Sequence, residues 1–335
     1  MLSTLDLPNP ICLNDITKDQ FVSDLQAMAK PFVIRGFAKD WAFVSSLKNN
    51  SAGADLLTLA NDHSLAMPLT RIPFSEKSRM FYNENMDAMN FGVASLPLDN
   101  VFKRMLSATR DADYAAQCVP LARYFPALLP GLNNPLVPAD CSPFIWFGNK
   151  VIVAPHYDES DNLAVVLAGK RRFTLFPPDQ IENLYIGPLE HTPAGQAISL
   201  VNILEPDLHK HPRYEEAYRH AMSVELSPGD AIYIPTPWWH HVQSMSDFNI
   251  LINYWWNECA LGTAKPMGAM LHSMQAYRNL PTAQRQAFRA LFDYYVFGDA
   301  TRTHDHLPKH VKGILTGLSP ETRQGFEQWV RDHSK

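Results

Sequence analysis

The middle of the chain alternates short apolar runs with turn residues. Between Phe144 and Trp256, eight such runs are rich in β-branched and aromatic side chains and are separated by turn-forming residues, a pattern typical of short β-strands. They cover residues 144–147, 150–156, 162–168, 171–176, 221–226, 230–234, 240–244 and 249–255. Short strands joined by tight turns favour an antiparallel jelly roll over a parallel α/β sheet. We therefore predict a mainly β fold, a double-stranded β-helix.

The region before these strands mixes helical and extended patterns. Residues 17–29 have a helical spacing, and residues 31–36 form a β-branched run that ends at a glycine. The Pro-rich stretch 128–138 is too interrupted for regular structure and has the composition of a connector. We expect an N-terminal α/β elaboration of the β core.

The region after the strands is helical. Apolar residues recur at helical spacing from Ala283 to Tyr295, behind Pro281. A second helix is predicted to begin at Ser319-Pro-Glu, with Ser319 as its N-cap. The apolar stripe of the first helix favours homodimerisation, with packing on the protein's own β core as the alternative. The three expected regions are residues 1–140, 141–258 and 259–335.

Composition places the chain among globular proteins. Of its 335 residues, 46% are hydrophobic and 11% aromatic, enough for a large core, which excludes disordered and fibrous classes. The 29 Lys and Arg residues against 34 Asp and Glu give a net charge of −5, so no broad positive surface is expected to bind nucleic acid. The sequence has no apolar stretch of about 18 residues and no signal-like start. These features predict a soluble cytoplasmic protein with no membrane partner.

Four cysteines are scattered along the chain, at positions 12, 118, 141 and 259, without a Cys-x-x-Cys pair. Zinc knuckles and redox dithiols need closely spaced cysteines. The spacing therefore excludes both and predicts buried thiols in a reducing compartment.

Two separated motifs carry the candidate chemistry. His156 and Asp158 lie two residues apart on a predicted strand, so their side chains share a face, and together they offer two of the three ligands of a facial metal triad. The run from Ser227 to His241 predicts a turn, a strand and a Pro-rich corner that deliver a third ligand. Alternation favours His240, which shares the apolar inward face. His241 is expected to make a hydrogen bond at the rim.

Other motifs carry less information. The pairs His209/His211 and His304/His306 lie among Pro, Lys and Arg without a distant third ligand, as expected of surface loops. The sequence contains no Gly-x-Gly-x-x-Gly, no phosphate-binding Gly-Lys-Ser/Thr loop and no Gly-x-Ser-x-Gly elbow. Nucleotide binding and acyl transfer therefore have no support.

Taken together, the motifs resemble a known enzyme family. They are His-Tyr-Asp-Glu at 156–159, Asn162, Gly-Lys-Arg-Arg-Phe-Thr-Leu-Phe-Pro-Pro-Asp-Gln at 169–180 and Gly-Asp-Ala-Ile-Tyr-Ile-Pro-Thr-Pro-Trp-Trp-His-His at 229–241. Their spacing is similar to that of the JmjC and cupin-like Fe(II), 2-oxoglutarate oxygenases, in particular the asparaginyl hydroxylase type that inhibits hypoxia-inducible factor. The dense part of the match covers about residues 140–257.

The resemblance implies an iron centre. Its ligands would be His156, Asp158 and His240, with 2-oxoglutarate and dioxygen as co-substrates. Three ligands on one face of an octahedron leave three positions open, which suffices for a bidentate 2-oxo acid and dioxygen.

The far carboxylate of 2-oxoglutarate needs a cationic partner inside the barrel. If Gly169-Lys170 forms a two-residue hairpin loop, Ala168 and Arg171 are paired and both face inward. Arg172 then points outward. The family places a lysine at position 171, and a guanidinium binds a carboxylate at least as well. The alternative interpretation is that Lys170, Arg171 and Arg172 form a solvated strand end.

The same alignment assigns further residues of the site. Asn162 and Asn253 match asparagines that line the co-substrate site, and Tyr114 matches a hydroxyl donor to the co-substrate. Val153 stands where the family has a threonine that binds the same carboxylate. Trp255 matches a tryptophan near the iron, with core filling as the alternative.

The implied reaction is hydroxylation of a substrate, or demethylation where the hydroxylated carbon is an N-methyl group, with release of succinate and CO₂. A protein side chain is the expected substrate; a tRNA base or a small molecule are alternatives. Residues 194–201 lack the Arg-Gln pair that holds the target amide in the asparaginyl hydroxylase, so asparagine is not the expected target. The rival from another class is a non-catalytic cupin-like sensor of metal or ligand, which would need no clamp such as Arg171.

Overall fold

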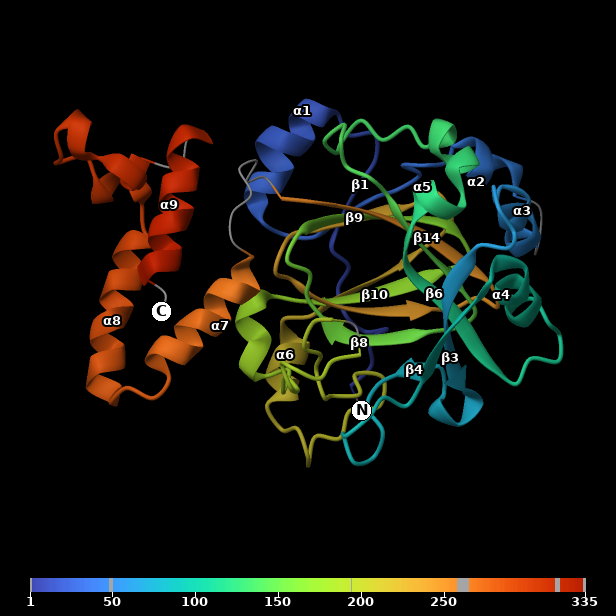
Figure 1. Cartoon of the computed structure of the whole chain (residues 1–335). Helices are drawn as coiled ribbons and strands as arrows, with labels where there is room; N and C mark the ends of the chain where they lie inside the picture. The colour runs from blue at the N-terminus through green and yellow to red at the C-terminus, as the bar shows by residue number, and fades with distance from the viewer. Residues whose placement is uncertain (1, 48–50, 194, 258–264, 317–319, 334–335) are drawn as a thin grey trace. The chain divides into compact units, whose positions relative to one another are not determined.

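The computed structural model describes residues 2–47, 51–193, 195–257, 265–316 and 320–333 (Figure 1). The chain divides into two compact units, Met1–Trp256 and Asn257–Lys335. Within the described ranges, the first unit holds every strand and the second holds only helices. The division falls close to the predicted boundary after residue 258.

Two sheets build the first unit. The larger has nine strands in the order β1-β2-β12-β9-β14-β7-β6-β3-β5, and the smaller has five in the order β11-β10-β13-β8-β4. The eight predicted strands are all present, which confirms the jelly roll. They are β7 (Phe144–Gly148), β8 (Ile152–His156), β9 (Asp161–Ala168), β10 (Arg171–Phe176), β11 (Met222–Leu226), β12 (Ala231–Ile234), β13 (Trp239–Ser244) and β14 (Asn249–Trp256).

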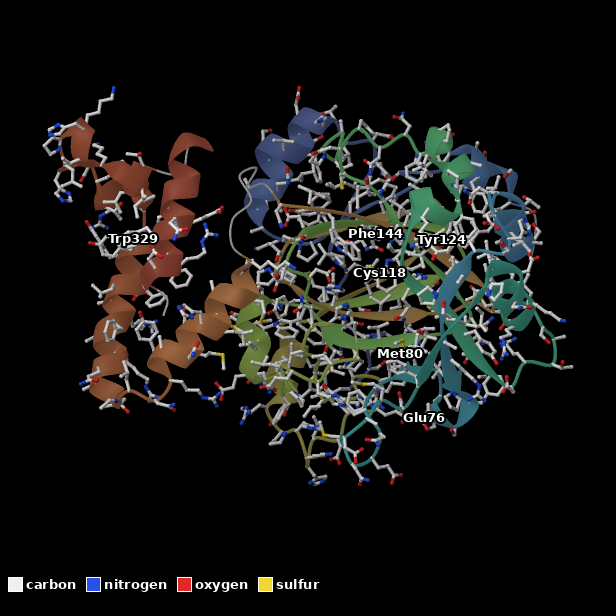
Figure 2. All side chains as sticks on the ribbon, viewed as in Figure 1. Glu76, Met80, Cys118, Tyr124, Phe144 and Trp329 are labelled. Carbon is white, nitrogen blue, oxygen red and sulfur yellow. The ribbon has the colours of Figure 1, made fainter. Side chains whose placement is uncertain are left out.

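The interior between the sheets is filled by alternate residues of these strands. Ala164 and Val166 of β9 contact the same apolar cluster as Phe173 and Leu175 of β10. Side chains fill the space between the strands throughout this unit (Figure 2). Full burial of each large apolar side chain contributes about 1.5–3 kcal/mol, so the period-two pattern fixes which face of each strand points inward.

The connection from β9 to β10 differs from the prediction. β9 pairs with β12 and β14 in the larger sheet, whereas β10 pairs with β11 and β13 in the smaller one. Gly169 and Lys170 therefore cross between the sheets and do not close a hairpin ladder. Gly169 has a φ of +72° at this crossing, a conformation that suits glycine.

The expected inward position of Ala168 is also wrong. The pairing of β9 with β14 shifts register close to this residue, and Ala168 packs in the outer core instead. Arg171 still faces the interior, because it has the parity of Phe173 and Leu175 within β10. The inward direction of Arg171 thus follows from the alternation of side chains along β10 and not from the hairpin predicted at Gly169 and Lys170.

The N-terminal region extends both sheets. Strands β1 (Ile11–Leu13) and β2 (Phe32–Ile34) add to one side of the larger sheet, and β6 (Ala112–Pro120), β3 (Ala66–Pro73) and β5 (Gly92–Pro97) add to the other. β4 (Arg79–Met80) joins the smaller sheet. The helices of this unit are α1 (Lys18–Gln20), α2 (Ala42–Ser46), α3 (Ala52–Thr58), α4 (Leu98–Met105), α5 (Leu121–Tyr124) and α6 (Tyr214–Arg219).

Helix α4 shows how these helices attach. Leu98, Val101, Phe102 and Met105 are buried at helical spacing and pack into the outer core of the larger sheet. Asp99 lies in the first turn, and the two basic residues of the helix lie in its last turn, which complements the helix dipole.

The second unit consists of α7 (Pro266–Tyr277), α8 (Thr282–Tyr295) and α9 (Pro320–His333), with short 3₁₀ turns. The predicted helix of residues 283–295 is α8. Ser319, the predicted N-cap of the last helix, lies outside the described residues. No described helix is long and apolar enough to cross a bilayer.

Candidate metal centre

His156 and His240 face each other across neighbouring strands. They are directly paired residues of β8 and β13, and their ring centroids lie 4.3 Å apart. Asp158 follows β8, and its Oδ2 lies 3.6 Å from His240 Nε2. One ligand atom from each of the three residues lies within 4.8 Å of the others. The structure therefore brings together the three residues that the sequence nominates as metal ligands.

Backbone carbonyl groups fix both imidazole rings. His156 Nδ1 lies 2.9 Å from the carbonyl oxygen of Ala154, and His240 Nδ1 lies 3.1 Å from that of Trp238. A proton on each Nδ1 satisfies these contacts and leaves each Nε2 lone pair free. Burial, followed by the neighbouring His240, lowers the pKa of His156 to about 4. His156 is therefore neutral at pH 7, the form that binds metal.

Hydrogen bonds also hold the carboxylate. Asp158 Oδ2 accepts from Asn162 Nδ2 at 3.2 Å and from the indole N–H of Trp255 at 3.0 Å. Asn253 Nδ2 in turn donates to Asn162 Oδ1 at 2.7 Å. The hydroxyl of Thr236, in the Pro-rich corner, donates to the backbone carbonyl of Asp158 at 2.7 Å. Such contacts orient a carboxylate ligand before a metal arrives.

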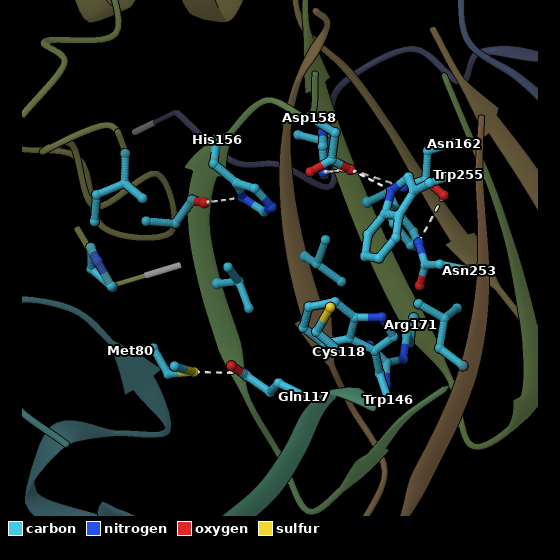
Figure 3. A pocket seen from close by; sticks show the side chains of 18 residues that line it. Met80, Gln117, Cys118, Trp146, His156, Asp158, Asn162, Arg171, Asn253 and Trp255 are labelled. Carbon is cyan, nitrogen blue, oxygen red and sulfur yellow. Dashed lines mark hydrogen bonds and ion pairs between the residues drawn. The ribbon is translucent and has the colours of Figure 1, made fainter. Parts of the chain in front are cut away.

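A cavity of about 170 Å³ lies beside the three residues and extends into the barrel (Figure 3). Both sheets contribute to its wall. Of the site residues predicted from the sequence, all but one line this cavity: His156, Asp158, His240, Asn162, Arg171, Asn253 and Trp255.

Arg171 is the cation of this cavity. The residue is 7% exposed, and its buried Nε has no hydrogen-bond partner in the described part of the chain. Desolvation alone lowers its pKa to about 9, so the guanidinium is still charged at pH 7. Its neighbours Lys170 and Arg172 instead pair with Glu225, at 3.1 and 3.2 Å. Burial of a charge without a counter-ion is costly, and this arrangement therefore suits an anionic ligand.

The structure does not bring Tyr114 to this cavity. Its hydroxyl donates to Asp111 Oδ1 at 2.5 Å, and its ring packs in the outer core. The pairing of β6 with β7 shifts register between Ala116 and Val119, so the side chains that β6 presents to the cavity lie beyond Tyr114. The hydroxyl donor that the resemblance implies is therefore not available here.

His241 is buried, where a hydrogen bond at the rim was expected. It is 3% exposed, and its Nδ1 has no hydrogen-bond partner within the described residues. Desolvation, followed by the nearby Arg79, lowers its pKa to about 3, so the ring is neutral at pH 7. It lies opposite Thr174 in the ladder of β10 and β13, on the face of β13 away from the cavity.

Several cavity residues escaped the sequence analysis. Gln117 and Cys118 reach the wall through the irregular part of β6, where Cys118 has a φ of +51°. The sulfur of Met80, which also lines the cavity, accepts a hydrogen bond from Gln117 Nε2 at 2.8 Å. No local sequence signal marks that irregularity. Trp146 of β7 also lines the cavity. Because neighbouring residues of a strand point to opposite faces, the sequence could have predicted that Trp146 faces inward and Phe147 outward.

The donor set matches a particular kind of metal centre. Two imidazoles and one carboxylate on one side of a cavity are the facial arrangement used for non-haem Fe(II), and they leave open positions toward the cavity. With the buried cation of Arg171, the cavity offers a place for a metal chelator that also carries a distant negative charge.

The comparisons with known proteins define the class. Residues 18–260 match the cupin-like domain family, and the chain belongs to this family. Among curated relatives are HSPB1-associated protein 1 from Homo sapiens, 34% identical over 113 residues, lysine-specific demethylase JMJ31 from Arabidopsis thaliana, 33% identical over 101 residues, and tRNA wybutosine-synthesizing protein 5 from Mus musculus, 37% identical over 101 residues.

These similarities are partial. The matched segments make up 33%, 30% and 30% of this chain and 22%, 18% and 29% of the three relatives. The chain therefore aligns with less than a third of the length of each of them.

Proposed function

We propose that the protein is an Fe(II)- and 2-oxoglutarate-dependent oxygenase that hydroxylates a protein side chain and releases succinate and CO₂. Membership of the cupin-like family supports this proposal, as does the cluster of His156, Asp158 and His240. The observation that carries it is Arg171, a buried cation in the cavity beside the metal ligands, for which the described residues provide no ion pair and whose Nε has no hydrogen-bond partner among them.

The residues of the cavity would divide the work. His156, Asp158 and His240 would hold Fe(II), and the guanidinium of Arg171 would bind the far carboxylate of 2-oxoglutarate. The iron, when bound with its co-substrates, supplies the oxidising power that places one oxygen of O₂ in a substrate C–H bond and the other in succinate. Asn162 holds Asp158 in place, and apolar residues such as Phe173 and Leu251 form part of the remaining wall.

The identity of the substrate is the finer part of the proposal. The net charge of −5 gives little attraction for phosphate backbones, which favours a protein side chain over RNA. The printed names of the relatives supply the alternatives. Lysine-specific demethylase JMJ31 suggests hydroxylation of an N-methyl carbon, and tRNA wybutosine-synthesizing protein 5 suggests a tRNA base. A small molecule and a non-catalytic cupin-like sensor remain alternatives.

Anaerobic addition of Fe(II) and 2-oxoglutarate tests the proposal. The wild-type protein is expected to develop the visible charge-transfer band of chelated iron, and to form succinate once air is admitted. Asp158→Ala, which lacks the carboxylate ligand, is the control and should show neither signal. A wild-type protein with neither signal would contradict the proposal, and a band without succinate in the presence of candidate substrates would favour the sensor.

We also propose that two copies of the chain pair through the C-terminal helices. No residue of α7 or α8 is buried, and apolar side chains such as Leu291, Tyr295 and Phe297 are 51%, 57% and 77% exposed. Leu291 and Tyr295 are four residues apart on α8 and so share one face of the helix, and an exposed apolar helix face is typical of an interaction surface.

Truncation after Trp256 should convert a dimer into a monomer, as measured by light scattering with size-exclusion chromatography. Leu291→Glu in the full chain should have the same effect, because it places a charge on the apolar stripe. Lys265→Glu is the control and should remain dimeric. A truncated chain that still forms a dimer would refute pairing through these helices.

A further inference from the structure

Three buried polar atoms around the cavity lack a partner within the described residues. They are the indole Nε1 of Trp146, Nε of Arg171 and Oδ1 of Asn253, and all three residues line the cavity. A buried donor or acceptor that stays unpaired costs about 1–3 kcal/mol. The two N–H donors among these atoms indicate a ligand that accepts hydrogen bonds, or ordered water in its place.

Trp146 approaches the cavity from the sheet opposite to Arg171. It lies in the middle of β7, paired with Leu251 of β14, whereas Arg171 begins β10 of the smaller sheet. Figure 3 labels both side chains in the wall of the same cavity. Both also line a second, smaller cavity of about 30 Å³. Arg171 and Trp146 therefore line the same end of the site.

The donors expected at this end are missing. Tyr114 is hydrogen-bonded to Asp111 and packs in the outer core, and position 153 holds a valine, which lines the cavity without a donor. Apolar residues also line this cavity, among them Phe173, Val242 and Leu251. In such surroundings one additional N–H donor has a strong electrostatic effect.

We propose that Trp146 is a second donor to the far carboxylate of the oxo acid, so that Arg171 and Trp146 together select 2-oxo acids with a second carboxylate over those without one. The inference rests on the proposed function. A carboxylate accepts several hydrogen bonds, so its oxygens can satisfy the guanidinium and the indole N–H at the same time. The Trp146 N–H thereby performs the role that the resemblance assigns to a hydroxyl.

Trp146→Phe tests this assignment, because it removes the N–H and keeps an aromatic ring in the wall. Binding of 2-oxoglutarate and of 2-oxopentanoate, which has the same chain length without the second carboxylate, is measured by calorimetry on Mn(II)-loaded protein under nitrogen. The variant is expected to bind 2-oxoglutarate about tenfold more weakly, since one hydrogen bond to a charged group is lost. Its affinity for 2-oxopentanoate should not change.

Two further variants sharpen the comparison. Trp41→Phe removes an indole N–H that donates to the Asn133 carbonyl, away from the cavity, and should leave both affinities unchanged. Trp146→His keeps a ring N–H and should recover part of the affinity for 2-oxoglutarate. This rescue separates loss of the donor from misfolding, and melting temperatures are recorded for each variant.

The other outcomes overturn one proposal or the other. If the wild-type protein binds 2-oxoglutarate and Trp146→Phe binds it equally well, the N–H is satisfied by water and the inference fails. If the variant loses both oxo acids equally, Trp146 shapes the wall and does not recognise the carboxylate. If the wild-type protein binds no 2-oxoglutarate at all, the proposed function fails, and the inference fails with it.

Discussion

His240→Ala is expected to abolish metal binding, whereas His241→Ala should preserve it. His240 lies opposite His156 at the candidate metal centre, and His241 points to the other face of the same strand. Loss of a hydrogen bond that merely orients a ligand weakens metal affinity by about 10- to 100-fold. Removal of the ligand itself should therefore cost more than about 100-fold.

The two variants form a matched pair. Both delete an imidazole that is 3% exposed, and both should destabilise the fold through the space they leave, so only the metal affinity should separate them. Titration with Co(II), followed by visible absorption under nitrogen, gives that affinity. Loss of Co(II) binding in His241→Ala but not in His240→Ala would mean that β13 pairs one residue out of register, since a shift of one residue exchanges its two faces.

Arg171→Met is expected to weaken 2-oxoglutarate binding while stabilising the protein. The lost charge-assisted hydrogen bonds contribute about 1.5–3 kcal/mol, which corresponds to roughly a 10- to 100-fold higher dissociation constant. The folded protein in turn no longer buries a cation that lacks an ion pair with the described residues, and an apolar replacement of similar length can pack against Phe173 and Leu251 in the wall. The melting temperature should therefore rise.

The control is Arg172→Met, one residue further along the strand. Arg172 pairs with Glu225 at 3.2 Å on the outer face of the sheet, so its loss should leave 2-oxoglutarate affinity unchanged. Calorimetry on Mn(II)-loaded protein and thermal melting give the two quantities. An unchanged affinity in Arg171→Met would assign the carboxylate to another group and remove the main support for the proposed function.

Much of the β core could be predicted from local patterns. Apolar alternation located all eight strands between Phe144 and Trp256, and the bounds of β10 agree with the prediction. The spacing of His156 and Asp158 on one extended segment sufficed to predict that both side chains point to the same side, where they form the metal cluster with His240. These features depend on the two-residue repeat of a strand, which the sequence records directly.

The errors arise where a strand departs from that repeat. The shift in β6 turns Tyr114 outward and brings Gln117 and Cys118 to the cavity. The shift beside Ala168 changes its face in the same way. A bulge adds one residue to one strand only, and whether it forms depends on the partner strand. Local sequence does not specify that partner.

The contacts between the two sheets could not be predicted from local sequence either. That Trp255 donates to Asp158 follows from the way β14 lies across from β8, and strand order is a property of the whole chain. The assignment of β9 and β10 to different sheets is a similar case, because a short connection is compatible with either a hairpin or a crossing.

The two walls of the cavity differ in chemical character. The histidines and Arg171 come from β8, β13 and β10 of the smaller sheet, whereas Asn162, Asn253 and the two tryptophans come from β9, β14 and β7 of the larger one. A substitution in the neutral wall would therefore act on the metal indirectly, through Asn162 and Trp255, which hold Asp158. A substitution in the charged wall would instead remove a metal ligand or the buried cation itself.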